Sequence, residues 1–455
     1  MANFTLEEVC CATGGTKLGQ VNLTEFTGVY TDSRKVVPGS LFVALKGENF
    51  DGHAFIADVI AKGAAAVIVD RPVASTVTTI LCANTLKALQ DLAAFHRRRF
   101  AIPVIAITGS NGKTTTKDML AAILAEKWNV VKTPGNYNNE IGLPLTLLAL
   151  TSETQVAVVE MGMRGRGQIA ELAAIAAPTA AIVTTVGETH IELLGSLDNI
   201  AAAKAELVEA IAADGFVVLN NDNPYVAAMD SVAKAPVATF GLAETASVRA
   251  QNVVMSRDKI TFDCMTAAET FAVVVPALGE HNVLNALAAI TAAQKLGLTS
   301  DAIIQGMLHF SPSGMRLAME AAGPYQVIND AYNASPASMK SALETLKTIH
   351  SGRRVAVLAD MLELGEQSVM LHRQVGAVAA KTVDLLVTLG ALGAEIASGA
   401  KEAGLTAVYT CKDHGEVVAV LRSKLTPEDL ILVKGSRGMK MEQIIASLRD
   451  TSSQN

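Results

Sequence analysis

One pattern recurs through the central and C-terminal parts of the chain. An apolar run ends in a polar turn, and a segment with apolar residues at helical spacing follows it. Val104 to Thr108 is such a run, and residues 113 to 128 follow it with Leu120, Leu124 and Trp128 on one helical face. A buried strand reads as a continuous apolar run, whereas a helix lying on a sheet shows apolar residues at a period of about 3.6. The alternation therefore predicts parallel strands connected by helices.

The same signals predict further elements along the chain. Between residues 237 and 278, short β-rich runs alternate with turns, which predicts an antiparallel patch. The other strands are expected at residues 41 to 45, 64 to 70, 156 to 160, 181 to 186, 216 to 220, 325 to 331, 354 to 361, 385 to 390 and 430 to 435. Helices are expected at residues 199 to 213, 337 to 349 and 367 to 380.

The length of 455 residues is too great for one hydrophobic core, and at roughly 100 to 200 residues per domain it predicts three domains. Clusters of turn-forming or polar residues at 97 to 103 and 311 to 314 are the candidate boundaries. The expected fold class is α/β. A small mixed domain would span residues 1 to 99. A central parallel-sheet domain, which includes the antiparallel patch, would span residues 100 to 313, and a Rossmann-like doubly wound domain would span residues 314 to 455.

Composition and charge narrow the functional classes. Half of the residues are apolar and 18% are charged, which is typical of a globular protein. The formal net charge of −7 argues against nucleic acid as a partner, because such binding needs a concentrated basic face. The basic run Arg97 to Arg99 is interpreted as a solvated segment between domains.

The cysteines and the apolar stretches bear on the compartment. Five scattered cysteines without metal-ligand spacing imply neither disulfides nor a zinc site, which favours the reducing cytoplasm. The N-terminus lacks a basic segment followed by an apolar run, so no secretory signal is expected. The stretch closest to a membrane span, residues 172 to 187, is broken by Pro178 and is too short to cross a bilayer.

Residues 108 to 115, Thr-Gly-Ser-Asn-Gly-Lys-Thr-Thr, have the pattern of a phosphate-binding loop between a strand and a helix. Gly109 and Gly112 allow backbone N–H groups to approach phosphate oxygens, and the dipole of the following helix adds to the attraction. Lys113 supplies a mobile positive charge, and the hydroxyl of Thr114 is placed to bind a phosphate-bound Mg2+. The central domain is therefore expected to be P-loop ATPase-like.

The loop has the shorter GxxGKT form, because Ile107 stands where the longer GxxxxGK[ST] pattern has its first glycine. A structural turn is the alternative interpretation, but the position between a strand and a helix favours nucleotide binding. The residues predicted to bind ATP here are Thr108, Gly109, Ser110, Asn111, Gly112, Lys113, Thr114 and Thr115.

Three side chains beyond the loop are candidates for the metal site. Glu160 closes an apolar run, so its carboxylate should leave the sheet at the edge where the loop lies, with a surface glutamate as the alternative. His190 follows the next predicted strand, but imidazole is not a preferred Mg2+ ligand, so a structural histidine is equally consistent. Lys204 lies in an alanine-rich helix, where a solvated lysine is the simpler interpretation. Burial would instead lower its pKa and leave an amine able to react with CO2.

Two short N-terminal segments combine hydroxyl groups, cationic side chains and a glycine whose backbone groups are accessible. They are Thr31-Asp32-Ser33-Arg34 and Lys46-Gly47. Such groups can hold a phosphate, although a polar turn is an equally consistent interpretation.

With these motifs in order, the chain resembles the Mur ligase family of peptidoglycan synthesis over essentially its whole length. Each motif is modest alone, and their combination in this order is specific. The segments that carry the resemblance are residues 31 to 34, 39 to 47, 108 to 115, 135 to 144, 160 to 162, His190, 203 to 206, 279 to 282, Asn285, Ala286, Arg316, 330 to 334 and 433 to 437.

The resemblance implies a role for each matched residue. Ser33, Arg34, Lys46 and Gly47 would bind the UDP end of one substrate, with Asn138 and Asn139 on the same side. Lys113, Glu160, His190 and Lys204 would be catalytic. Metal binding would fall to Thr114, Glu160, His190 and Lys204, with Lys204 N-carboxylated and two Mg2+ bound. Asn282 and Asn285 would face adenine, and Arg316 and Asp330 would reach the phosphates and ribose of ATP. Tyr332 and Asn333 would lie on the side of the amine substrate.

The implied activity is an ATP-dependent ligase that forms a C–N bond. A substrate carboxylate would attack the γ-phosphorus of ATP, giving an acyl phosphate and ADP, and an amine would then displace phosphate. The motifs at residues 138 to 142 and 330 to 333 favour the branch that adds D-alanyl-D-alanine to UDP-N-acetylmuramoyl-tripeptide. A cytoplasmic monomer that binds neither nucleic acid nor a membrane is expected.

Two alternatives differ from this interpretation. A sister ligase that adds the third peptide residue, or a folylpolyglutamate synthase, would share the ATP site. The former typically carries Asp-Asn-Pro-Arg in its third domain, whereas here Asp222-Asn223-Pro224 is followed by Tyr225 and lies in the central domain. A nucleotide-dependent switch that forms no bond is the alternative from another class.

Overall fold

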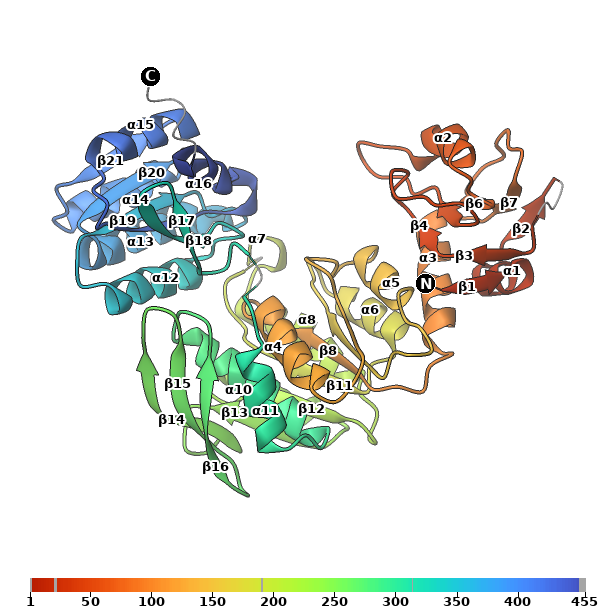
Figure 1. Cartoon of the computed structure of the whole chain (residues 1–455), viewed down its shortest axis with the longest axis horizontal. Helices are drawn as coiled ribbons and strands as arrows, with labels where there is room; N and C mark the ends of the chain where they lie inside the picture. Colours follow the sequence, from red (N-terminus) through yellow and green to blue (C-terminus); the bar gives the residue numbers. More distant parts are fainter. Residues whose placement is uncertain (1, 20–22, 190, 313, 450–455) are drawn as a thin grey trace.

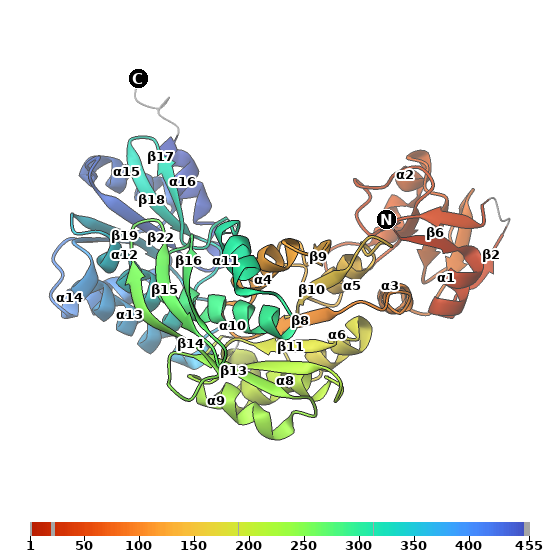
Figure 2. The same cartoon turned by 60° about the horizontal axis from the view of Figure 1, so that its bottom comes forward.

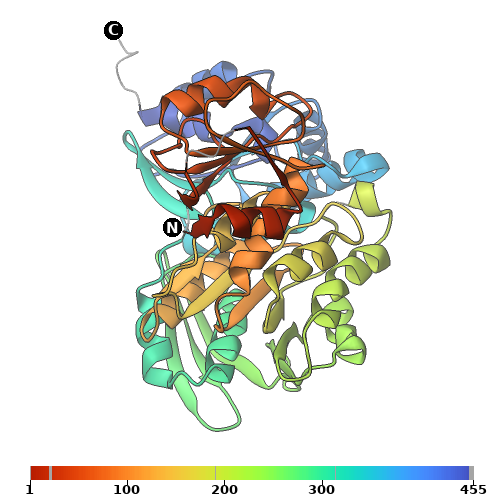
Figure 3. The same ribbon diagram turned by 90° about the vertical axis from the view of Figure 1, so that its right-hand side faces the viewer.

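The computed structural model describes residues 2–19, 23–189, 191–312 and 314–449. The chain forms three α/β units in an open arc, with the N-terminal unit at one end, the C-terminal unit at the other and the central unit between them (Figure 1). Viewed from the N-terminal side, the N-terminal unit stands above the central unit, and the C-terminal unit lies behind it (Figure 3). The predicted α/β class with two parallel-sheet units is confirmed.

The N-terminal unit contains two sheets. In the larger one β4 to β7 are parallel neighbours, and β2 pairs antiparallel with β7. The strands are β1 (Asn3–Thr5) paired with β3 (Glu25–Thr27), and in the larger sheet β2 (Thr16–Leu18), β7 (Thr78–Leu81), β6 (Ala66–Val69), β5 (Leu41–Val43) and β4 (Val29–Tyr30). The helices are α1 (Leu6–Thr13), η1 (Gly52–Phe55), α2 (Ile56–Ala61) and α3 (Thr85–Arg97).

A nine-stranded sheet crosses the central unit. From edge to edge its order is β16 (Thr270–Val275), β15 (Ile260–Met265), β14 (Val248–Met255), β13 (Val237–Gly241), β12 (Phe216–Asn220), β11 (Ala180–Val183), β8 (Val104–Thr108), β10 (Val156–Glu160) and β9 (Val130–Lys132). Neighbours from β9 to β14 are parallel. The strands β8, β10 and β11 are buried on both faces, which explains their continuous apolar sequences.

The predicted antiparallel patch is an extension of this sheet. Strand β14 is parallel to β13 but antiparallel to β15, and β15 is antiparallel to β16. The pairing of β14 with β15 shifts register between Gln251 and Val254, the position of a bulge.

Helices cover both faces of the central sheet. Helices α4, α10 and α11 share one core with it, and α5, α6 and α8 lie on the opposite face. The helices of this unit are α4 (Lys113–Ala125), α5 (Gly142–Leu147), α6 (Gln168–Ala176), α7 (Ile191–Leu194), α8 (Leu197–Glu209), α9 (Pro224–Ala227), η2 (Ala228–Val232), α10 (His281–Lys295) and α11 (Ser300–Leu308).

The C-terminal unit is a doubly wound sheet, as predicted. Its order is β17 (Ala318–Ala322), β18 (Tyr325–Asp330), β22 (Leu430–Lys434), β19 (Arg354–Ala359), β20 (Leu385–Leu389) and β21 (Val408–Cys411), and only the β17 to β18 pairing is antiparallel. The helices are α12 (Pro336–Ile349), η3 (Gly365–Gln367), α13 (Ser368–Thr382), α14 (Gly393–Glu402), α15 (His414–Lys424), η4 (Arg437–Met439) and α16 (Glu442–Arg449).

Helix α3 joins the N-terminal and central units (Figure 2), and its apolar side chains belong to one continuous core with residues of α5 and α6. Arg97, its last residue, is buried and donates hydrogen bonds to the carbonyl oxygens of Ala176 (2.9 Å), Phe100 (2.6 Å), Ile102 (3.3 Å) and Ala177 (3.2 Å). The prediction of a solvated basic run is therefore wrong for Arg97. Backbone carbonyl oxygens at the end of α6 and in the loop after α3 accept hydrogen bonds from its guanidinium.

Within the described residues, no helix combines the length and apolar character that crossing a lipid bilayer requires. The second candidate boundary, residues 311 to 314, includes Ser313, which lies outside the described part of the chain.

Candidate active site

A cavity of about 1020 Å3 lies between the central and C-terminal units. Its central wall is formed by loops that follow β8, β10 and β11, and its other wall by segments that follow β18, β19 and β22. Open parallel sheets place such loops at the carboxyl ends of their strands, which is the usual position of a binding crevice.

The phosphate-binding loop follows β8 and leads into α4, as predicted. Its glycines are required by space as well as by backbone angles. A Cβ at Gly109 (φ 149°) would lie 1.9 Å from Oγ1 of Thr184, and a Cβ at Gly112 (φ 85°) would lie 2.3 Å from Oδ1 of Asn285. Side chains at these two positions would displace the loop from the segment after β11 and from α10, which support it.

The segment after β11 holds the phosphate-binding loop in place through hydrogen bonds. Oγ1 of Thr184 donates to the carbonyl oxygen of Asn111 at 2.6 Å, and the backbone N–H of Ser110 donates to the carbonyl oxygen of Thr185 at 2.7 Å. Oγ of Ser110 also exchanges hydrogen bonds with the backbone of Gly187. The loop is therefore held in shape by neighbouring backbone, which is the preorganisation that an anion site needs.

Lys113 folds back over the loop, where its Nζ donates to the carbonyl oxygen of Gly109 at 2.7 Å. Burial lowers the pKa of this ammonium, and the carboxylate of Glu160 acts in the opposite direction. A cation so near the loop amides can exchange its carbonyl partner for phosphate oxygens of a bound nucleotide.

Glu160 ends β10 and is 2% exposed. Its Oε2 accepts from Oγ1 of Thr114 at 2.9 Å, and its Oε1 accepts from Nδ2 of Asn138 at 2.7 Å. The alternative of a surface glutamate is wrong, because the carboxylate is enclosed between the phosphate loop and Asn138. A hydroxyl and a carboxylate beside a phosphate site are the oxygen ligands that Mg2+ prefers.

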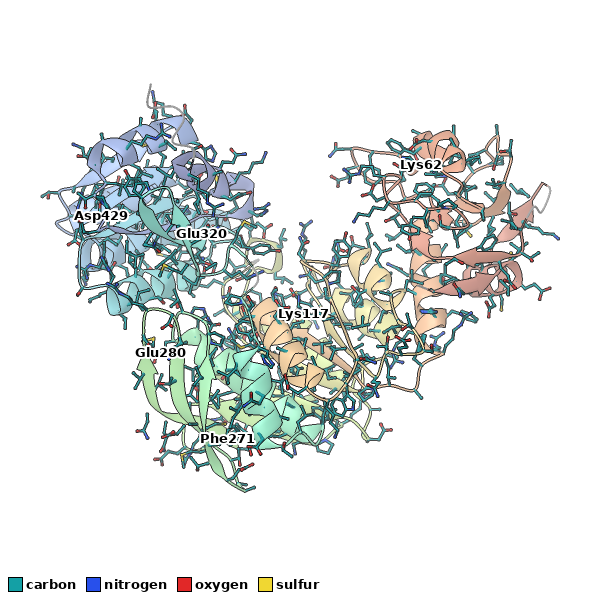
Figure 4. The ribbon with its side chains drawn as sticks, in the orientation of Figure 1. Lys62, Lys117, Phe271, Glu280, Glu320 and Asp429 are labelled. Carbon is teal, nitrogen blue, oxygen red and sulfur yellow. The ribbon has the colours of Figure 1, made fainter. Side chains whose placement is uncertain are left out.

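Lys117 and Thr133 position Glu160 from behind, and sequence reasoning missed both. Lys117 lies on α4 (Figure 4), is 1% exposed, and donates from Nζ to the carbonyl oxygen of Thr133 at 2.8 Å. Oγ1 of Thr133 accepts from the backbone N–H of Glu160 at 2.9 Å. A lysine one turn after the loop, on the face of α4 that packs on the sheet, is the sequence signal that could have revealed this link.

Lys204 is 2% exposed on α8 and lines the cavity. Burial, and then the positive charge of Lys113, hold its pKa well below the usual range. Among the described residues its Nζ has no hydrogen-bond or salt-bridge partner. The interpretation of Lys204 as a solvated helix lysine is therefore wrong, because small alanines around it bring the amine inward.

His190 lies outside the described residues, so its predicted role stays a prediction. The preceding residues Gly187 and Thr189 line the cavity. In the part of the chain that the structure describes, no three His, Cys, Asp or Glu side chains converge as a metal-binding group.

Asn282 and Asn285 lie next to the loop on the first turns of α10 and line the cavity. Nδ2 of Asn285 donates to Oδ1 of Asn282 at 2.8 Å, and Oδ1 of Asn285 accepts from Oγ1 of Thr116 at 3.3 Å. Both amides are buried, so their orientation is fixed before a ligand binds.

The C-terminal wall brings together the other predicted nucleotide residues. The guanidinium of Arg316 stacks over the ring of Tyr332 at 3.9 Å from its centroid. Asp330 forms an ion pair of 2.6 Å with Lys434, whose Nζ also donates to the carbonyl oxygen of Asn333 at 2.9 Å. Lys434 had no predicted role, although a lysine that ends a buried apolar run signals a charge at the sheet edge.

The remaining substrate residues lie in two places. Asn138 and Asn139 line the cavity, but Oδ1 of Asn139 also accepts from the backbone N–H of Gly142 at 2.9 Å and so shapes the turn before α5. Ser33, Arg34, Lys46 and Gly47 do not line the cavity. They lie in loops after the parallel neighbours β4 and β5, which places both loops at one edge of the N-terminal sheet.

Three segments of the chain match known domain families. Residues 25–97 match the Mur ligase family, catalytic domain; residues 107–293 match the Mur ligase middle domain; and residues 315–437 match the Mur ligase, glutamate ligase domain.

The chain is similar to named proteins over almost all of its length. The UDP-N-acetylmuramoyl-tripeptide--D-alanyl-D-alanine ligase of Bacillus subtilis is 40% identical over 438 residues, covering 94% of each chain. The ligase of the same name from Escherichia coli is 36% identical over 430 residues, covering 93% of each chain.

Solved structures agree with this similarity. A crystal structure of MurF from Acinetobacter baumannii has a TM-score of 0.92 at 33% identity, covering 99% of this chain and 100% of that one. The structure of MurF ligase from Thermotoga maritima in complex with ADP has a TM-score of 0.83 at 27% identity, covering 92% of this chain and 96% of that one.

Proposed function

The chain belongs to the Mur ligase family, and on this premise we propose that it is the ATP-dependent ligase that joins D-alanyl-D-alanine to UDP-N-acetylmuramoyl-tripeptide. The product is the UDP-MurNAc-pentapeptide of peptidoglycan synthesis. The observation that carries the proposal is the hydrogen-bonded pair of Thr114 and Glu160 at a phosphate loop that faces a second unit across a cavity of about 1020 Å3. Relatives named for this reaction, similar over more than nine-tenths of their length, support the substrates.

The reaction proceeds in two steps. The terminal carboxylate of the tripeptide attacks the γ-phosphorus of ATP, so that an acyl phosphate forms and ADP leaves. The amine of the dipeptide then attacks the acyl carbon, the amide bond forms, and inorganic phosphate leaves with loss of one proton from the amine. Backbone amides of the loop and the ammonium of Lys113 offset the charge of the transferring phosphoryl group.

The residues around Glu160 fit Mg2+, since an enclosed carboxylate and a hydroxyl lie at the phosphate site. Thr114 and Glu160 would hold it, with His190 as a further ligand by family resemblance. When bound, Mg2+ neutralises phosphate charge. We extend the proposal to a second Mg2+ held by an N-carboxylated Lys204, because a buried amine with a strongly lowered pKa is neutral enough to react with CO2.

ATP binding involves both walls of the cavity. Asn282 and Asn285 face adenine, while Arg316 and Asp330 reach the phosphates and ribose when the C-terminal unit approaches. Such an approach excludes water, which protects the acyl phosphate from hydrolysis. Tyr332 and Asn333 lie on the same wall and contact the amine substrate.

The N-terminal unit binds the UDP end of the substrate through Ser33, Arg34, Lys46 and Gly47. We also propose domain boundaries at residues 99 and 313. The strands of the two N-terminal sheets lie before the first boundary, those of the central sheet lie between the two, and those of the C-terminal sheet lie after the second. We also propose a monomer in the cytoplasm, where ATP and reducing conditions are available. The five free cysteines support that compartment.

A phosphate-release assay with an amine panel tests the function. Purified enzyme should release phosphate from ATP only when UDP-MurNAc-tripeptide and D-alanyl-D-alanine are both present. Release with a single diamino acid or with glutamate in place of the dipeptide would identify a sister ligase or a folylpolyglutamate synthase. Rapid hydrolysis without either substrate would instead identify a nucleotide-dependent switch.

A further inference from the structure

The loop between β10 and α6, residues 161 to 167, begins next to Glu160 and leads into a helix that packs against α3. Arg164, in the middle of this loop, lines the cavity. Gln90 of α3 lines the same cavity, and its Nε2 donates to the carbonyl oxygen of Glu140 at 3.3 Å. This part of the cavity therefore leads from the phosphate loop toward the N-terminal unit, to which we assign the UDP end of the substrate.

Neighbouring groups hold the loop between β10 and α6 in one shape. The backbone N–H of Gly162 donates to the carbonyl oxygen of Asn138 at 2.8 Å. Farther along, Oε1 of Gln168 accepts from the backbone N–H groups of Arg164 at 2.6 Å and Gly165 at 3.2 Å. The backbone that carries the side chain of Arg164 is thus ordered before a ligand binds, which lowers the cost of binding.

Glu206 anchors the far end of this loop. Its Oε1 accepts from the backbone N–H of Gly167 at 2.7 Å, and its Oε2 accepts from that of Ala170 at 3.1 Å. A carboxylate at a helix N-terminus satisfies N–H groups that have no partner within the helix, and the helix dipole favours its charge. Glu206 lies on α8 together with Lys204, so the helix that carries the buried lysine also fixes the start of α6.

Six lysine and arginine side chains line the cavity: Lys113, Arg164, Lys204, Arg316, Lys434 and Arg437. Lys113 is hydrogen-bonded to the phosphate loop, Arg316 is stacked on a ring, and Lys434 and Arg437 are in ion pairs. Lys204 is buried. Within the part of the chain that the structure describes, Arg164 is the exposed cation of the cavity whose guanidinium has no hydrogen bond, ion pair or ring contact.

The chemistry of the guanidinium limits what can occupy this part of the cavity. The carboxylates that line it, Glu140 and Glu171, form no ion pair with Arg164 in the described structure. A guanidinium offers five N–H donors in a planar arrangement that matches the two oxygens of a carboxylate or of a phosphate. An anionic group of the substrate is therefore the expected partner of Arg164.

We propose that Arg164 binds a second carboxylate of the UDP-muramoyl-tripeptide, carried by the residue next to the one whose carboxylate reacts. Arg164 follows Glu160 by four residues, a separation of at most about 14 Å along extended backbone. Consecutive residues of a peptide are about 3.8 Å apart, so a carboxylate on the second residue can reach Arg164 while the terminal carboxylate lies at the phosphate loop. The assignment rests on the proposed function and makes Arg164 the residue that selects an acidic tripeptide.

Phosphate-release kinetics of the full-length enzyme, with each substrate varied in turn, test the assignment. Arg164→Gln should raise the KM for UDP-MurNAc-tripeptide about tenfold or more, the loss expected for a charged hydrogen bond, and leave the other two KM values within about twofold. The Tm should not change, because the guanidinium has no partner to lose.

Arg166→Gln is the matched control, because Arg166 is a second exposed arginine of the same loop that does not line the cavity. It should leave all kinetic constants unchanged. An unchanged tripeptide KM in Arg164→Gln, or an equal rise in the two variants, would overturn the role of Arg164.

Two synthetic substrates identify the group that Arg164 binds. They are UDP-MurNAc-tripeptides that differ in one group, a free carboxylate or a carboxamide on the second residue. The wild-type enzyme should prefer the carboxylate about tenfold or more in kcat/KM, and Arg164→Gln should reduce that preference to about twofold or less. No preference in the wild type, or the full preference in the variant, would refute the proposal.

The diphosphate of UDP is the other anion of this substrate, and MurNAc-tripeptide without UDP distinguishes the two. Arg164→Gln should lower kcat/KM for this shorter substrate by the same factor, about tenfold or more. Loss of the effect with the shorter substrate would assign Arg164 to the diphosphate and overturn the proposal. A wild-type enzyme that releases no phosphate with the complete substrates would contradict the proposed function itself, which is a separate result.

Discussion

Oγ1 of Thr114 donates a hydrogen bond of 2.9 Å to Oε2 of Glu160, so the second residue of α4 meets the last residue of β10 at the carboxyl edge of the central sheet. The two belong to different strand-helix connections, and the parallel pairing of β8 with β10 brings them together. The Oε1 atom of the same carboxylate is held by Asn138. The contact gives the phosphate loop an oxygen-rich partner.

Glu160→Gln should abolish most of the ligase activity while the protein remains folded. The amide keeps the size of the side chain and an oxygen for Thr114, but it removes the negative charge that a bound Mg2+ requires. We expect kcat to fall by about 100-fold or more. Glu171→Gln, an exposed glutamate on α6 that also lines the cavity, is the control. Equal activity of the two variants in the phosphate-release assay would exclude Glu160 from the metal site.

Much of the central sheet could be predicted from the sequence. The expected strands at residues 104 to 108, 156 to 160 and 216 to 220 coincide with β8, β10 and β12. Strands buried on both faces in a parallel sheet must be apolar throughout, so that their ends are marked by the first polar residue. Helix ends were less certain: α4 stops at Ala125, three residues before the expected end at Trp128.

The environment of long cationic side chains could not be predicted. Arg97 and Lys204 are both buried, although the local sequence favours solvated interpretations. Arg97 depends on carbonyl oxygens of Ala176 and Ala177, which are distant in sequence. Lys204 depends on the packing of α8 against the sheet. Such acceptors and packing partners become neighbours only in the folded chain, so neither periodicity nor spacing records them.

Lys204→Met should abolish activity and raise the stability of the ligand-free protein. In the folded state burial keeps the pKa of Lys204 well below its ordinary value, whereas the unfolded chain binds a proton there up to about pH 10. Between these two pKa values the unfolded state binds more protons, so the folded state loses stability as pH falls. The gain from Lys204→Met should therefore be larger at neutral pH and shrink toward pH 10.

Rescue by short carboxylates distinguishes the chemical role of Lys204 from a structural one. Lys204→Ala should be inactive, and short carboxylates added to it should restore part of the activity, since they replace the missing carbamate oxygens. Thermal unfolding of Lys204→Met across pH 6 to 10 measures the linkage. A stability difference that is constant with pH would show that the amine is charged in the folded state.

Arg97→Met should weaken the joint between the N-terminal and central units. The change removes the donors of four hydrogen bonds. The carbonyl oxygens that lose this donor lie at the end of α6 and in the loop after α3. We expect a loss of about 3 kcal/mol in the free energy of unfolding, measured from the denaturant midpoint. The neighbouring Arg98 is exposed, so Arg98→Met should change that energy by less than about 0.5 kcal/mol. Equal effects of the two substitutions would contradict the burial of Arg97.

Gly109→Ala should abolish ATP binding, because the loop has room for no side chain at this position. The added Cβ would lie 1.9 Å from Oγ1 of Thr184 and 3.0 Å from the backbone N of Thr185, and φ is 149°. The loop would have to move away from β11, and its amides would no longer converge on phosphate. Titration with a fluorescent ATP analogue should show affinity lower by about 100-fold or more.

Gly165→Ala provides the matched control for this prediction. A Cβ at Gly165 meets no atom within 4 Å, and its backbone lies outside the left-handed region, so ATP affinity and Tm should match those of the wild type. If Gly109→Ala binds the analogue as tightly as Gly165→Ala does, the loop must adjust without cost. The phosphate site would then be formed by flexible backbone, and the support from Thr184 and Thr185 would have no part in ATP binding.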